Sequence, residues 1–199
     1  MKTIRIEIRN NSINIDGYVN AVGRDSNKLA GPSGIFIEQI VPKTFEKALE
    51  KTSEVKLLFN HKENRVLGTT KTNLKLYEDN IGLRAIATIE DEEVVKKAKE
   101  NKLTGWSFGF VALKDKWEET NGINKRFIED MELLEVSILD KTPAYTGTSI
   151  ETREDKTLIV ELRNNDFKAN IIDFSKENEK QIDFSKEKAI IEILKIKGV

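Results

Sequence analysis

The 199-residue chain contains no cysteine, which excludes disulfides, thiolate catalysis and cysteine metal sites together. Neither sign of charge is in excess, because 33 basic residues balance 34 acidic ones. Nucleic acid is therefore not expected as the main partner, since phosphate binding needs a basic excess on one face. No apolar run reaches about 18 residues, so no segment is expected to cross a membrane.

Histidine is nearly absent as well, because His61 is the only one in the chain. With one histidine and no cysteine, only carboxylates remain as further metal ligands, so a metal-binding module is a weak alternative. No metal and no cofactor are expected. Any acid–base chemistry that needs an imidazole must use His61.

Strand patterns dominate what the chain does contain. Residues 2–9 and 12–19 alternate between polar and apolar types around Asn10-Asn11, which is typical of two strands joined by a tight turn. Further strands are expected at 55–61, where alternation places Leu57, Phe59 and His61 on one face, and at 65–77, 81–89 and 123–140. Helices are expected only after Pro42 and after Asp91, which is a good N-cap for a helix that Gly105 ends. The order predicts a mainly β (α+β) fold, a small closed or partly closed antiparallel β-barrel flanked by short helices.

Two regions are expected along the chain. Residues 1–153 form the barrel domain, and residues 154–199 form a charged C-terminal extension that is rich in Lys, Glu, Asn and Asp. The extension carries two copies of I-D-F-S-K-E, at 172–177 and 182–187, and an amphipathic helix pattern over 186–197. This extension is expected either to dock on the barrel, a second subunit or a partner, or to be a partly disordered tail.

A candidate nucleophile, Ser107, lies in the G-x-S-x-G pattern of Gly105–Gly109. Glycine neighbours allow a substrate to approach a hydroxyl closely. Alternation places the aromatic residues at 106, 108 and 110 on the core side of a strand and Ser107 on the opposite side. In α/β-hydrolases the histidine follows the serine and the pattern runs from strand to helix. Here His61 precedes Ser107 and the pattern runs from a helix into a strand, so that family is excluded.

A serine nucleophile needs a base and an acidic group that orients the base. His61 is the candidate base, and Glu135 is the first candidate acid because a carboxylate in the apolar run E-L-L-E-V-S-I-L is costly unless a donor pairs with it. Alternation places Glu135 on one face with Leu133, Ser137 and Leu139. Glu132, on the opposite face, and Asp140, at the strand end, are the alternative acids. The non-catalytic interpretation is a packed histidine and a solvent-facing glutamate.

Several sequence blocks between about Ile13 and Arg153 occur together in a distinctive order. They are D-G-Y (16–18), I-x-x-x-V-P-x-x-F-x-x-A-L (37–49), L-L-F-N-H (57–61), V-L-G-T-T (66–70), G-L-R-A (82–85), G-W-S-F-G-F (105–110), L-L-E-V-S-I-L-D (133–140) and T-S-I-E-T-R (148–153). In this order they resemble the prohead (capsid maturation) serine proteases of tailed bacteriophages.

The resemblance implies a fold similar to the herpesvirus maturation protease and a serine endopeptidase that acts inside the assembling prohead, in the bacterial host cytoplasm. The substrates that the resemblance implies are the major capsid protein, scaffold segments and the enzyme itself. At the matching positions the base is His61, the nucleophile is Ser107 and the acid is Glu135. A homodimer is suggested only by analogy with the herpesvirus enzymes. A non-catalytic capsid assembly or scaffold factor with the same barrel is the alternative function.

Overall fold

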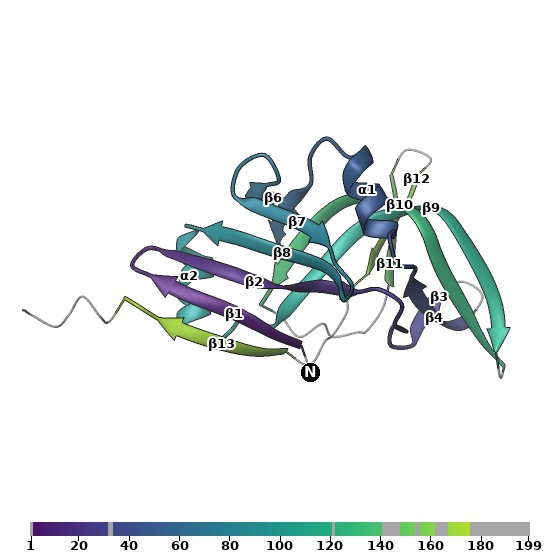
Figure 1. Ribbon diagram of the computed structural model, residues 1–199, viewed down its shortest axis with the longest axis horizontal. Helices are drawn as coiled ribbons and strands as arrows, with labels where there is room; N and C mark the ends of the chain where they lie inside the picture. The colour runs from purple at the N-terminus through teal and green to yellow at the C-terminus, as the bar shows by residue number, and fades with distance from the viewer. Residues whose placement is uncertain are drawn as a thin grey trace, which may run out of the picture.

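The computed structural model describes residues 2–31, 34–120, 122–140, 148–153, 156–161 and 167–175. The strands form two sheets, and the first has the order β13-β1-β2-β8-β7 (Figure 1). Its β1–β2 hairpin confirms the predicted turn at Asn10-Asn11, because the Arg9 and Ser12 positions are paired. The strands of this sheet are β1 (Lys2–Arg9), β2 (Ser12–Ala21), β7 (Leu74–Glu78), β8 (Gly82–Ile89) and β13 (Phe167–Asp173).

The second sheet is organised around β10 (Ile123–Leu139), which pairs with β9 (Gly105–Thr120) in a long antiparallel hairpin. On its other side β10 pairs in parallel with β4 (Gly34–Ile40) along its first part and with β5 (Lys56–Phe59) near its end. The remaining strands of this sheet are β3 (Leu29–Gly31), β6 (Lys62–Thr69), β11 (Thr148–Arg153) and β12 (Lys156–Glu161).

The mainly β prediction is confirmed, but the closed barrel is wrong, because the two sheets do not close on themselves within the described residues. The antiparallel barrel prediction failed because several strands pair in parallel. Strands β4 and β5 both lie parallel to β10, and β13 lies parallel to β1. Alternation within a strand reports which face is buried, and it does not report the direction or identity of the neighbouring strand.

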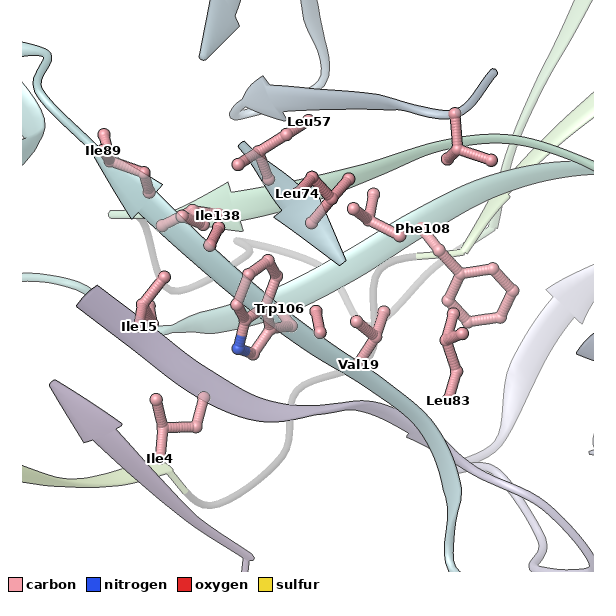
Figure 2. Packing of buried hydrophobic residues seen from close by; sticks show 14 of the residues in the cluster. Ile4, Ile15, Val19, Leu57, Leu74, Leu83, Ile89, Trp106, Phe108 and Ile138 are labelled. Carbon is pink, nitrogen blue, oxygen red and sulfur yellow. The ribbon is translucent and has the colours of Figure 1, made fainter. Parts of the chain in front are cut away.

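The hydrophobic core lies between the two sheets. Figure 2 shows Trp106 of β9 among Ile4 and Ile15 of the first sheet and Ile138 of β10. All four side chains are at most 4% exposed. Burial of a large apolar side chain stabilises a fold by about 1.5–3 kcal/mol, so this layer holds the inner face of β9 and β10 in place.

Two helices flank the sheets in the described part of the chain. In α1 (Thr44–Lys51), Phe45 packs edge-on against Phe108, with 5.3 Å between ring centroids. The predicted cap of α2 (Glu92–Lys99) is confirmed, because the Asp91 side chain accepts a hydrogen bond from the Val94 N–H. The helix ends before Asn101, whose φ of 54° is left-handed, and not at Gly105 as predicted.

Strands from the predicted C-terminal extension join both sheets. Strand β12 pairs with β9, and β13 pairs with β1. The first I-D-F-S-K-E copy begins within β13, and the Phe174 N–H that follows donates to the Ile8 carbonyl. The second copy and the helix pattern over 186–197 lie outside the described residues. The boundary at 153 stays a prediction.

Candidate active site

Ser107 lies on the face of β9 that points away from the aromatic core. Its partner across the β9–β10 pair is Ser137, and the neighbouring pair is Phe108 with Val136. Phe108 and Val136 belong to the core cluster, so Ser107 and Ser137 share the opposite face. Both serines are 0% exposed.

Glu135 reaches the Ser107 face because of a β-bulge. Leu133 pairs with Phe110 and Glu135 pairs with Gly109, which leaves Leu134 as the additional residue between them. Such a bulge reverses the alternation of every side chain that follows it. The prediction that Leu133 and Glu135 share one face was therefore wrong, since Leu133 packs in the core.

His61 also leaves the face that alternation predicts. Strand β5 ends at Phe59, which pairs with Lys62, so Asn60 and His61 form a two-residue hairpin turn. Both have left-handed backbones, with φ of 55° and 58°, as in a type I′ turn. Leu57 and Phe59 stay in the core. The prediction that His61 continues their face as the last residue of the strand was wrong, because the turn redirects the imidazole.

These two departures bring the imidazole and the carboxylate together. His61 Nδ1 lies 2.7 Å from Glu135 Oε1, and the two side chains are 17% and 12% exposed. An ionised carboxylate can only accept, so Nδ1 carries the proton and Nε2 of the neutral ring is the free base. Nε2 is buried and makes no hydrogen bond within the described part of the chain, so its bond to Ser107 is not formed in this state.

Asp140, one of the alternative acids, holds the turn that carries His61. Its Oδ1 accepts from Asn60 Nδ2 at 2.8 Å, and its backbone N–H donates to Asn60 Oδ1 at 3.1 Å. Lys97 of α2 donates to Asp140 Oδ2 at 2.7 Å, and this hydrogen bond raises the pKa of the Lys97 ammonium. Since Glu135 occupies Nδ1 and Nε2 has no partner among the described residues, Asp140 does not bind the imidazole ring.

Glu132, the other alternative, lies opposite Val111 on β9. The prediction that Glu132 and Glu135 lie on opposite faces of the strand was wrong. The bulge at Leu134 places both side chains on the face of the sheet that contains Gly109. Glu135 is the glutamate that contacts His61.

Ser137 is a site residue that the sequence reasoning missed. Its Oγ donates to Glu135 Oε2 at 2.6 Å and accepts from the His61 backbone N–H at 3.2 Å. The available signal was its position two residues after Glu135, which places both side chains on the same face of a strand.

Gly109 makes room for the carboxylate. A Cβ atom at this position would lie 2.7 Å from Glu135 Oε1 and 3.2 Å from its Cγ. The second glycine of G-x-S-x-G is thus needed at this point for the packing of an acidic side chain against β9. The outer edge of β9 at residues 108–110 is paired with β12, in which Glu161 is opposite Phe108.

The arrangement supplies an oriented imidazole base on the same face as a serine hydroxyl, which is the chemistry of nucleophilic acyl transfer. The described residues hold no group of three or more His, Asp or Glu that could bind a metal ion. Over the same ranges, no helix has the length and apolar character needed to cross a membrane.

Comparison with known proteins agrees with this chemistry. The family model described as Caudovirus prohead serine protease matches residues 2–163, which is well over half of the chain. No curated protein and no solved structure matches the chain. The matched range includes His61, Ser107 and Glu135. The chain therefore belongs to the Caudovirus prohead serine protease family.

Proposed function

We propose that the chain is a serine endopeptidase of phage head maturation that cleaves capsid and scaffold protein inside the prohead, and also cleaves itself. Ser107 is the nucleophile, His61 the general base and Glu135 the acid that orients the base. The observation that carries the assignment is the 2.7 Å contact between His61 Nδ1 and Glu135 Oε1 on the face that holds Ser107. Family membership supports the reaction class.

The reaction follows from the protonation states. His61 Nε2 takes the proton of Ser107 Oγ while Oγ bonds to the carbonyl carbon of the scissile peptide. The imidazolium then gives that proton to the leaving amine nitrogen as the C–N bond breaks, and water hydrolyses the acyl-enzyme by the same route. Glu135 stabilises the imidazolium throughout. A positioned base of this kind accelerates a reaction by about 10²–10⁴-fold.

Substrate binding must change this site before the reaction, because Ser107 is 0% exposed and His61 Nε2 has no hydrogen bond to it. Catalytic hydrogen bonds often form fully only when substrate is bound. The same observation favours the second candidate function, a non-catalytic capsid assembly or scaffold factor in which Ser107 stays buried.

Co-expression with the capsid protein of the same phage separates the two functions. Wild type is expected to cleave the capsid protein, and Ser107→Ala and His61→Ala are expected to lose cleavage. Ser53→Ala, a serine substitution after α1, is the matched control and should retain it. Undiminished cleavage by Ser107→Ala or His61→Ala contradicts the assignment. Capsid assembly that needs the chain without any cleavage by wild type supports the scaffold function.

Self-cleavage has its own test, which is the mass of the purified chain over time. Wild type is expected to lose mass while Ser107→Ala stays intact. A wild-type mass that never changes rules out self-cleavage and leaves the action on capsid protein to be judged by co-expression.

A further inference from the structure

Ser137 connects the three groups of the proposed site from a buried position on β10. It is directly opposite Ser107 across the strand pair and is 0% exposed. Its Oγ lies 2.6 Å from Glu135 Oε2 and 3.2 Å from the backbone nitrogen of His61. One hydroxyl thus contacts both the acid and the residue that carries the base.

The directions of these two hydrogen bonds follow from chemistry. A backbone N–H can only donate, so Ser137 Oγ accepts from His61, and an ionised carboxylate can only accept, so the Ser137 hydroxyl proton points to Glu135. Glu135 Oε2 is then held by Ser137 while Oε1 faces His61 Nδ1. Both carboxylate oxygens have a defined partner, which restricts rotation of the carboxylate.

We propose that Ser137 is a positioning residue that acts through Glu135 and the His61 backbone to orient the imidazole. This inference rests on the proposed function insofar as it concerns catalysis. The left-handed conformation of His61, with φ of 58°, needs such support, because non-glycine residues seldom adopt it without surrounding contacts. A serine hydroxyl can donate to the Glu135 carboxylate and accept from the His61 backbone N–H at the same time, whereas alanine at 137 removes both hydrogen bonds.

The first experiment observes the imidazole directly and needs no substrate. Since His61 is the only histidine, the imidazole ¹⁵N signals and the ¹H signal of a proton on an imidazole nitrogen belong to it without further assignment, and they are distinct from the indole N–H signals of the two tryptophans. Wild type is expected to show a protonated Nδ1 with a low-field proton line protected from solvent exchange. In Ser137→Ala this line should broaden or vanish, as it should in Glu135→Ala.

The second experiment measures the rate at which a fluorophosphonate labels the chain, with the modified residue identified by mass spectrometry. Labelling joins Ser107 Oγ to phosphorus, expels fluoride and leaves the serine proton on His61. Ser137→Ala is expected to slow it by about 10²-fold, the usual consequence of a misplacement of about 1 Å. In a Glu135→Ala background the same substitution should slow labelling much less, because the contribution through Glu135 is already lost and only the hydrogen bond from the His61 backbone N–H remains to be removed.

Ser26→Ala is the matched control. The Ser26 hydroxyl also accepts from a backbone N–H, that of Glu38 at 2.8 Å, and donates to an oxygen, the Asn27 carbonyl at 2.7 Å. Loss of the Ser26 hydroxyl removes a comparable pair of hydrogen bonds, one accepted and one donated, but these bonds involve neither His61 nor Glu135. The His61 NMR line and the labelling rate should therefore stay as in wild type. If Ser137→Ala does not fold, Ser137→Cys keeps the volume with only a weak donor and acceptor, and the same losses are expected.

The outcomes separate this inference from the proposed function. An unchanged His61 line and labelling rate in Ser137→Ala overturns the positioning role, and so does an equal loss with and without Glu135. A loss of the His61 line in Ser137→Ala, in a chain that is never labelled at Ser107, upholds the positioning role and refutes the protease assignment.

Discussion

The substitution Gly109→Ala tests whether the site depends on the close packing of Glu135 against β9. The added Cβ would lie 2.7 Å from Glu135 Oε1, 3.2 Å from Cγ and 3.4 Å from Cδ. Carbon atoms in good contact are about 3.5–4.0 Å apart, so the side chain must retreat by roughly 0.5–1 Å. Its two oxygens are bound to His61 and Ser137, so it cannot retreat without weakening one of these hydrogen bonds.

Two magnitudes follow from that displacement. Overpacking of a tight site costs about 1–3 kcal/mol, and each kcal/mol lowers the Tm of a chain of this size by about 2–4 °C. Misplacement of the acid by about 1 Å is expected to slow fluorophosphonate labelling of Ser107 by about 10²-fold. The assays are thermal unfolding and the labelling rate, both on the full chain.

Gly17→Ala is the matched control, because its Cβ would also meet an atom at 2.7 Å, here Cγ1 of Ile4 in the core between the sheets. It is expected to lower Tm similarly, yet to leave labelling near the wild-type rate well below that Tm. If Gly109→Ala is labelled as fast as wild type and keeps the His61 Nδ1 proton line, the packing argument for Glu135 is wrong.

Two further predictions concern the carboxylate of Asp140 beside the site and that of Asp130 on β10, which pairs with Lys51 of α1. Asp140→Ala removes the side-chain bonds to Asn60 and Lys97. A net loss of about 1 kcal/mol should lower Tm by about 2–4 °C. Ser107 labelling should slow less than in Glu135→Ala, and slowing that exceeds that of Glu135→Ala would make Asp140 the better candidate acid. The hydrogen bond from Lys51 lowers the pKa of Asp130 and outweighs the opposing effect of desolvation. Because the folded pKa lies below the unfolded one, this pair stabilises above about pH 4 and its contribution disappears as pH falls through the folded pKa. For this partly exposed pair, Asp130→Asn should cost about 0.2–1 kcal/mol near neutral pH and almost nothing near pH 2, as judged by Tm, and a constant difference across that range would contradict the linkage.

The sequence predicted those local features that depend on short-range chemistry. The β1–β2 hairpin around Asn10-Asn11 and the Asp91 cap of α2 are both present, since turn and cap preferences act within a few residues. Alternation also separated Ser107 from its aromatic neighbours, because β9 is regular at that point. The closed barrel failed because sheet closure depends on which distant strands pair.

The candidate site was predictable by residue type but not by geometry. Residue chemistry made the single imidazole, His61, the candidate base and made Glu135 the first of three candidate acids, with Glu132 and Asp140 left open. The order of His61 and Ser107 excluded the α/β-hydrolases. Only the tertiary structure decided that these groups meet. The bulge at Leu134 in the β9–β10 hairpin and the left-handed Asn60-His61 turn of the β5–β6 hairpin each reverse a side-chain direction, and both are set by the register in which the two strands pair. A one-residue change of register moves side chains to the other face of a sheet, which no local pattern reports.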